Sequence, residues 1–261
     1  MAAPRSIARA AHVVAVANRK GGAGKTTLAV NLAMELALRS ARVLLIDLDS
    51  QGHCALGLGI DPGDGGLAVH RLFDSSILLS DSILSSAHAG LDLAPADPRF
   101  EHGSGGTDFG RLAQALDEEW LRQRYDVIIL DTPPSLDLLL LNALYAADSV
   151  LIPFVPHPLS LAGIRQLMHT FYQVRAGHNP RLSLLGFVPN LANNQSRQHR
   201  DSRAEVTLTF GSHQVMTPIR ADIRLAEAFA RGLPIQKYAP GSRGAEDFQL
   251  LGESLGRLLG F

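Results

Sequence analysis

The chain has 261 residues, of which 46% are hydrophobic and 19% are charged, and its net charge at pH 7 is −1. This length suits one large domain with a full core, or at most two small ones. The single cysteine, Cys54, excludes a disulfide framework and a metal site built from cysteines alone. We expect neither a signal peptide nor a membrane-spanning helix, because no apolar run is long enough for either.

Charge is distributed unevenly along the chain. Residues 1–150 carry a net charge of −6, residues 151–243 carry +7, and residues 244–261 carry −2. Ten of the eleven basic residues in the middle block are arginines. A basic region on an otherwise acidic protein can steer it toward phosphate backbones, although scattered surface arginines would give the same count.

The first predicted elements are a strand over Val13–Ala17 and a helix from about Thr26 to Ser40. Between them lies the glycine-rich segment Asn-Arg-Lys-Gly-Gly-Ala-Gly-Lys-Thr-Thr, residues 18–27. A glycine-rich turn that opens a helix directs backbone N–H groups and the positive end of the helix dipole at a phosphate. Lys25 would reach the β- and γ-phosphates, and the Thr26 hydroxyl would hold Mg²⁺.

The loop departs from the common G-x-x-x-x-G-K-[ST] pattern, because Arg19 stands where the first glycine belongs and Lys20 opens the loop. The sequence K-G-G-x-G-K-T-T resembles the deviant Walker A motif of the ParA/MinD family. The resemblance implies that Lys20 crosses to the phosphates of a partner subunit in an ATP-bound dimer. It also implies that the nucleotide is bound by Lys20, Gly21, Gly22, Ala23, Gly24, Lys25, Thr26 and Thr27.

A second apolar run, Arg42–Asp47, predicts a buried parallel strand that leads into Asp-Leu-Asp-Ser-Gln-Gly. Carboxylates at the carboxyl end of a strand lie on the ligand side of an open α/β sheet. The family has a similar segment, which implies that Asp49 orients the attacking water and that Asp47 supports the metal and phosphate region. A helix N-cap formed by Asp49 or Ser50 is the alternative.

The middle of the chain carries weaker signals until residue 125. Then Tyr125–Asp131, followed by Thr-Pro-Pro, has the form of a Walker B strand, whose terminal Asp131 would reach Mg²⁺, usually through a water. The Thr-Pro-Pro turn resembles the family's switch II. Before it we expect glycine-rich loops at 52–66 and 102–107, a short helix at 67–73, a weak strand at 91–94 and a helix at 108–124.

Strands and helices alternate through the rest of the chain. We expect strands at 148–153 and 182–190, and helices at 136–147, 160–176, 196–210 and 245–261. The leucine-rich helix at 136–147 should be buried against the sheet or a partner subunit. The last helix has one arginine against three acidic residues, which favours a helix packed on the core over a basic membrane anchor.

The family resemblance continues to the carboxyl terminus. Residues 219–228, I-R-A-D-I-R-L-A-E-A, with G-L-P-I and Y-A-P-G-S-R-G-A behind them, resemble the signature of the chromosome-partition branch. By the same resemblance, Asn190 would face the adenine. The candidate DNA-binding residues are Arg165, Arg197, Arg200, Arg203, Arg220 and Arg224.

These observations predict a three-layer α/β P-loop fold with a mostly parallel sheet, in one domain over 1–261 whose first twelve residues are flexible. The resemblance implies a slow, partner-stimulated ATPase with catalytic residues Lys20, Lys25 and Asp49. Its cofactors would be ATP and Mg²⁺, the metal being held by Thr26, Asp47 and Asp131. In the ATP state we expect a cytoplasmic, nucleoid-associated homodimer that binds DNA nonspecifically.

Hydrolysis stimulated by a ParB-like protein or a cargo adaptor would then release the DNA. Two alternatives stay open: a MinD-like spatial regulator that cycles on and off the membrane, and a nucleotide-gated binding protein with negligible turnover. A redox relative such as the nitrogenase iron protein would need cluster cysteines, which this chain lacks.

Overall fold

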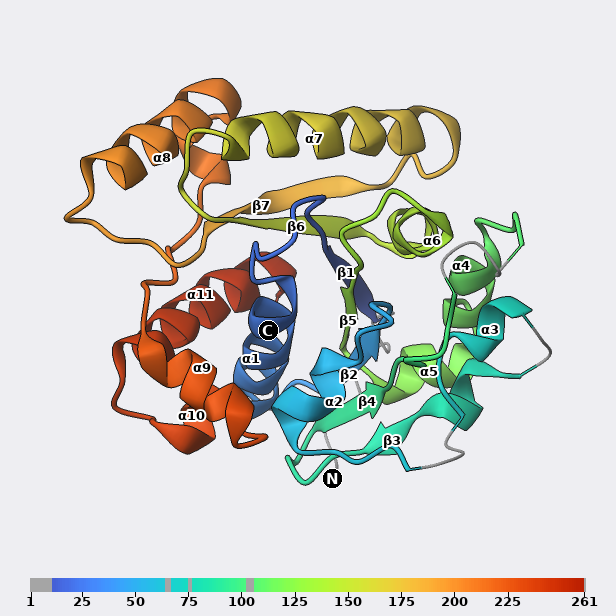
Figure 1. The fold of residues 1–261 in the computed structure, drawn as a ribbon. Helices are drawn as coiled ribbons and strands as arrows, with labels where there is room; N and C mark the ends of the chain where they lie inside the picture. The colour runs from blue at the N-terminus through green and yellow to red at the C-terminus, as the bar shows by residue number, and fades with distance from the viewer. Residues whose placement is uncertain (1–10, 64–66, 75–76, 102–105, 261) are drawn as a thin grey trace, which may run out of the picture.

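The computed structural model describes residues 11–63, 67–74, 77–101 and 106–260. Within them, seven strands form one sheet in the order β3-β4-β2-β5-β1-β6-β7, in which only β3 is antiparallel (Figure 1). The strands are β1 (His12–Val16), β2 (Val43–Asp47), β3 (Leu84–Ser85), β4 (Leu91–Ala94), β5 (Val127–Asp131), β6 (Ser149–Phe154) and β7 (Ser183–Pro189).

The register of the central strands positions the functional residues. In the pairing of β5 with its two neighbours, Asp131 lies opposite Val16 of β1 and opposite Asp47 of β2. Parallel strands end at the same edge of a sheet, so the glycine-rich loop after β1 and both aspartates meet there. The predicted parallel sheet, and the convergence of these three segments at its carboxyl edge, are confirmed.

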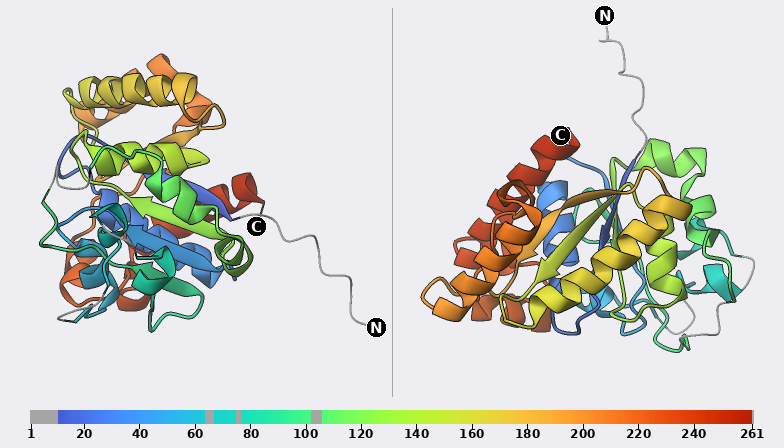
Figure 2. Two further views of the ribbon diagram at one scale, coloured as in Figure 1. Left: turned by 90° about the vertical axis from the view of Figure 1, so that its right-hand side faces the viewer. Right: turned by 90° about the horizontal axis from the view of Figure 1, so that it is seen from above.

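Helices cover both faces of the sheet, which gives the predicted three layers (Figures 1 and 2). One face packs against α1 (Lys25–Leu38), α2 (His53–Leu58), α9 (Ile223–Ala230), α10 (Ile235–Tyr238) and α11 (Arg243–Leu259). The other packs against α3 (Arg71–Asp74), α4 (Arg111–Leu116), α5 (Glu119–Arg124), α6 (Leu138–Ala146), α7 (Ser160–Gly177) and α8 (Arg197–Phe210). Two short 3₁₀ helices, η1 (Leu79–Ser82) and η2 (Ser212–Gln214), complete the elements.

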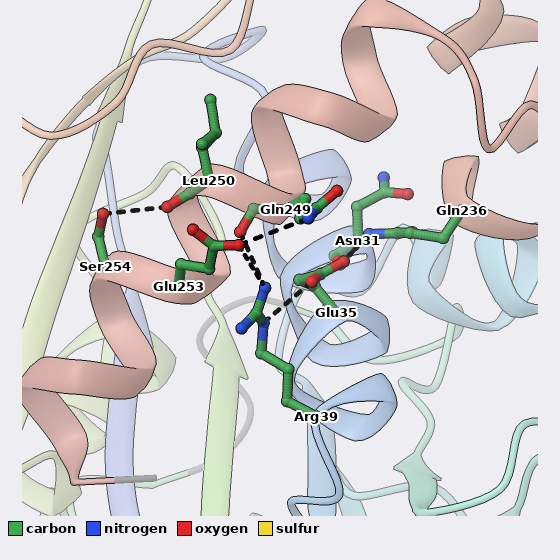
Figure 3. Close-up of polar contacts among 8 residues, drawn as sticks. All are labelled: Asn31, Glu35, Arg39, Gln236, Gln249, Leu250, Glu253 and Ser254. Atoms are coloured by element: carbon green, nitrogen blue, oxygen red, sulfur yellow. Dashed lines mark hydrogen bonds and ion pairs between the residues drawn. The ribbon is translucent and has the colours of Figure 1, made fainter.

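Helix α11 packs along α1 (Figure 3). The last helix was predicted to pack on the core, and its buried face does so. Nine of its seventeen residues are buried. At the contact, the Arg39 guanidinium donates to Glu35 of its own helix at 3.0 Å and to Glu253 of α11 at 3.3 Å. Glu35 is nevertheless buried, and burial raises its pKa despite the neighbouring Arg39.

Several predicted elements are wrong in extent. The helix predicted over 108–124 is two helices, because Glu118 takes an extended conformation between α4 and α5. Within the loop predicted at 52–66, Gly52 and Gly59 bracket α2, both in the left-handed conformation that glycine tolerates. The short helix predicted at 67–73 is α3, which begins only at Arg71.

His12, the last residue of the segment predicted to be flexible, 1–12, is the first residue of β1. Residues 1–10 lie outside the described residues, as do parts of the two predicted loops (64–66 and 102–105). Helices α9 and α10 had not been predicted as separate elements. Among the described residues, every helix falls short of the length and apolar character needed to cross a bilayer.

Candidate nucleotide-binding site

The glycine-rich loop joins β1 to α1 and is anchored at both ends. At its start, the Asn18 carboxamide donates to the Pro153 carbonyl at 2.6 Å and accepts the N–H of Lys20 at 2.8 Å. Gly22 and Gly24 have φ values of +74° and +79°, a conformation that residues with a side chain rarely adopt. A Cβ at Gly24 would also collide with the Asn190 amide. The glycines are therefore required by the backbone path.

The two lysines of the loop lie in different environments. Lys20 is exposed to solvent, whereas Lys25, at the start of α1, is only 7% exposed. Burial lowers the pKa of Lys25, while Asp131 and Asp49 act against this shift by favouring its charged form. Lys25 is thus a buried cation held among carboxylates, and Lys20 is free to reach outward.

Two fully buried carboxylates, Asp47 and Asp131, lie below the loop. The Asp47 carboxylate accepts the N–H groups of Asp49 at 3.1 Å and Cys54 at 3.0 Å. Burial, followed by the nearby Asp131, raises the pKa of Asp47 well above its ordinary value. Burial also raises the pKa of Asp131 to about 6, against the opposing effects of the Thr26 hydroxyl and the Lys25 ammonium.

These residues fit a magnesium ion. Asp131 Oδ2 accepts from the Cys54 thiol at 3.5 Å, but Asp131 Oδ1 is buried with no hydrogen-bond partner. A buried carboxylate oxygen without a donor is destabilising unless a cation or its bound water occupies the adjacent space. The Thr26 hydroxyl, a hard oxygen donor, lies beside the same carboxylate. The predicted metal residues Thr26, Asp47 and Asp131 are therefore brought together.

A cavity of about 340 Å³ opens above this cluster. Asp49 lies at its wall, and its carboxylate accepts the N–H of Gln51 at 3.1 Å within the turn after β2. The N-cap of α2 is Gly52, so neither Asp49 nor Ser50 caps that helix. The cavity is lined by Gly21, Gly22, Gly24, Lys25, Thr26, Thr27, Asp49, Gln51, His53, Pro134 and Phe229.

Sequence reasoning missed some of this lining. His53 and Phe229 line the cavity but were not among the candidate site residues, and Phe229 reaches the cavity from α9, far along the chain. The one sequence signal that could have indicated that His53 lines the cavity is its position shortly after the Asp-x-Asp segment. A larger cavity, of about 650 Å³, lies around His12 and Asp148 and contains none of the loop residues.

Asn190, the candidate adenine contact, follows β7 directly and lies beside the loop. Its side-chain NH₂ donates to the Ala23 carbonyl at 3.1 Å and the Gly24 carbonyl at 3.4 Å, and its side chain is nearly fully buried. These contacts give Asn190 a role that sequence reasoning had not assigned, which is to brace the phosphate loop. Its contact with adenine stays a prediction.

The candidate DNA-binding arginines fall into two groups. Arg197, Arg200 and Arg203 are exposed on α8, a fourteen-residue helix with only Ser202 and Val206 buried. Arg220, in contrast, binds Asp247 and Glu246 of α11 at 2.7 Å each. Arg224 is 3.8 Å from Asp222, and Arg165 is exposed on α7. The structure thus gathers three of the six on one exposed helix and uses Arg220 to hold α11.

Comparison with known proteins gives consistent results. The family model described as AAA domain matches residues 11–184. The chromosome-partitioning ATPase Soj of Thermus thermophilus is 38% identical over 93% of this chain and 94% of its own length. The chromosome partitioning protein ParA of Caulobacter vibrioides is 34% identical over 90% of each chain.

Solved structures agree with the sequence relatives. The crystal structure of cobyrinic acid a,c-diamide synthase from Mycobacterium smegmatis, with bound ATP analogue and magnesium, superposes with a TM-score of 0.78. It is 30% identical and the match covers 95% of each chain. The deviant loop, the paired strand-end aspartates and the relatives lead to one conclusion: the chain belongs to the ParA/MinD family of P-loop ATPases, which includes Soj and ParA.

Proposed function

We propose that this protein is a single-domain, Mg²⁺-dependent ATPase that dimerises in its ATP state and then binds DNA nonspecifically, so as to position DNA or a protein cargo. The observation that carries the proposal is the burial of Lys25 at the end of the glycine-rich loop, near the carboxylates of Asp131, which ends β5, and Asp49, which follows β2. A buried cation beside backbone N–H groups is suited to a triphosphate.

Each part of the site has a distinct role in this proposal. The loop from Gly21 to Thr27 would hold the phosphates, and Thr26 and Asp131, supported by Asp47, would hold Mg²⁺. When bound there, Mg²⁺ would supply positive charge against the phosphate oxygens. Asp49, at the cavity wall, orients the attacking water. Hydrolysis of ATP to ADP and phosphate depends mainly on this positioning and charge neutralisation.

Lys20 supplies a positive charge in trans. It is exposed at the start of the loop, and within the described part of the chain its hydrogen bond is made by its backbone N–H, to Asn18. A second subunit can therefore meet its side chain without breaking an existing contact. In a face-to-face dimer the Lys20 ammonium stabilises the partner's phosphates, much as an arginine finger does.

DNA binding depends on the dimer, because two copies of α8 double the number of arginines presented to phosphates. The protein would thus be cytoplasmic and nucleoid-associated in its ATP state. A ParB-like protein or a cargo adaptor stimulates hydrolysis, and the ADP-bound monomer leaves the DNA. The cycle therefore converts ATP turnover into directed positioning.

Phosphate release is the direct test. Wild-type protein, Lys20→Ala and Lys25→Ala are incubated with ATP, Mg²⁺ and fragmented DNA, and dimerisation is followed by light scattering. We expect slow, DNA-dependent hydrolysis in the wild type and none in either variant, with ATP still bound by the Lys20→Ala monomer. Hydrolysis at the wild-type rate in Lys20→Ala would contradict the role in trans.

The same samples separate the two alternatives. Sedimentation with anionic liposomes, with and without ATP, tests membrane cycling; we expect no ATP-dependent pelleting, because α11 uses its apolar face to pack on α1. A nucleotide-gated binding protein would bind ATP and dimerise but release no phosphate.

A further inference from the structure

His70, which immediately precedes α3, is a buried histidine that makes polar contacts on both sides of its ring. Its ring is 1% exposed and stacks on Phe100 with centroids 4.5 Å apart. Nδ1 lies 2.9 Å from the backbone N of Asp97, and Nε2 lies 3.2 Å from the backbone O of Leu48. The side chain therefore joins the loop after β4 to the turn after β2.

The two partners determine the tautomer of the ring. The Asp97 N–H can only donate, so Nδ1 accepts and carries no proton. The Leu48 carbonyl can only accept, so Nε2 carries the proton and donates it. These two contacts therefore match the tautomer whose one N–H is directed at the Leu48 carbonyl. A second proton on Nδ1 would break the bond from Asp97.

The Leu48 carbonyl belongs to the peptide unit that leads into Asp49. The N–H of that same unit is the one that donates to Asp47 Oδ1 at 3.1 Å. On the preceding side, the Leu48 N–H donates to the Asp131 carbonyl at 2.9 Å. A peptide unit is planar, so fixing its carbonyl oxygen also fixes its N–H direction. The His70 bond therefore sets the orientation of the Leu48–Asp49 peptide plane.

We propose that His70 is a positioning residue that orients the Leu48–Asp49 peptide and, through it, the Asp49 carboxylate at the wall of the phosphate cavity. The inference deepens the proposed ATPase function and rests on it for the role of Asp49. His70 itself does not line the cavity, so it acts on the reaction only through this turn. Small displacements of a group that places the attacking water can reduce the rate about tenfold or more.

Two substitutions separate the two ring nitrogens. In His70→Gln, the longer side chain places an N–H donor where Nε2 was and keeps the bond to Leu48. In His70→Asn, the shorter side chain keeps an acceptor near Nδ1 for Asp97 but cannot reach Leu48. Both lose the stacking on Phe100, so they form a matched pair. Asn142→Ala serves as a control, since Asn142 is fully buried and accepts the Leu112 N–H at 3.0 Å, away from this turn.

Two measurements are made on the full chain: kcat with KM for ATP, and hydrogen exchange of the Asp49 amide by NMR. We expect His70→Asn to lower kcat about tenfold with KM little changed, and to speed Asp49 exchange about tenfold. His70→Gln should stay within about twofold of wild type in both. Asn142→Ala should lose thermal stability but keep kcat and Asp49 exchange.

Equal Asp49 exchange in His70→Asn and His70→Gln would overturn the inference, because the Leu48 bond would then not hold the peptide. Equal kcat values in His70→Asn and His70→Gln would also overturn the inference, provided that the wild type hydrolyses ATP. If the wild type hydrolyses no ATP, the proposed function fails separately, and the exchange comparison still decides whether His70 orients the turn.

Discussion

The phosphate cavity and helix α8 are built on opposite principles. The cavity and the carboxylates below it bring together buried groups from the loop, β2 and β5. These groups depend on one another: Lys25 balances Asp131, and Asp47 holds the backbone of Asp49 and Cys54. On α8 the arginines are exposed, and the contacts that the described residues make with them are local, such as that of Asp201 with Arg197 at 3.6 Å. Changes within the first region should therefore be large and non-additive, and changes within the second small and additive.

The largest expected effect tests the mutual dependence in the cavity. Lys25→Ala removes the buried cation and leaves the surrounding carboxylates uncompensated, so we expect MgATP binding to weaken about a hundredfold. Isothermal titration calorimetry measures the affinity. In the double variant with Asp49→Ala, part of the loss should be recovered, because one uncompensated charge is gone. Strictly additive losses would show that the two groups act independently.

Helix α8 provides the contrasting case. Replacing Arg197, Arg200 and Arg203 together by alanine should weaken DNA binding about tenfold at moderate salt. The slope of the logarithm of the binding constant against the logarithm of the salt concentration should become shallower by about one for each phosphate contact that is lost. Fluorescence anisotropy with a labelled duplex at several salt concentrations gives both quantities. Single variants should sum to the triple variant. Arg175→Ala, on α7, is the control for an arginine outside the predicted set.

Nucleotide affinity at the cavity should also depend on pH, whereas DNA binding by α8 should not. Because burial raises the pKa of Asp131 to about 6, its carboxyl becomes protonated as the pH falls through that value. A neutral carboxyl is a poor ligand for Mg²⁺ or its bound water, so Mg²⁺-dependent nucleotide affinity should fall about tenfold per unit below pH 6. Isothermal titration calorimetry from pH 5 to 8 measures this nucleotide affinity.

Asp131→Asn is the matched variant for this measurement, because the nucleotide phosphates titrate in the same range in both proteins. The difference between the two profiles isolates the carboxyl group. A variant that loses Mg²⁺-dependent affinity with the same pH profile as the wild type would assign the titration to the nucleotide.

Sequence patterns predicted that the glycine-rich loop and the strand-end aspartates would meet, because this convergence follows from local rules. A glycine-rich turn between a strand and a helix, and aspartates that end parallel strands, must meet at one edge of the sheet, and Asp47 does lie opposite Asp131. The contacts of His70 and Asn190 could not be predicted in this way. Each depends on a backbone group far along the chain, at Leu48 and at Ala23, and no periodic pattern records such a pairing.

The helix predicted over 108–124 was wrong in its boundaries for a related reason. The pattern over 108–124 is helical throughout, yet the extended conformation of Glu118 breaks it, so the tertiary structure overrides a local preference. Helix α8 was predicted nearly to its ends, because its Ser196 N-cap and the following arginines are local signals. The ends of the exposed helix α8 were thus easier to predict, although its proposed role in DNA binding rests on family resemblance.

The smallest effect is expected outside both regions, at Glu35 on α1, whose side chain is 7% exposed. Its pKa is raised in the folded state, so the stability it contributes is present below its unfolded pKa and is lost as the pH rises through the folded value. Glu35→Gln removes this ionisation, while Arg39 keeps its contact with Glu253. At pH 7 we expect a gain of less than about 1 kcal/mol, or a rise in Tm of about 2 °C, that disappears toward pH 4. Thermal denaturation between pH 4 and pH 7 measures this gain in stability, and Glu253→Gln, at a more exposed position, is the control. A gain that does not depend on pH would mean that packing, and not the ionisation of Glu35, limits stability at this contact.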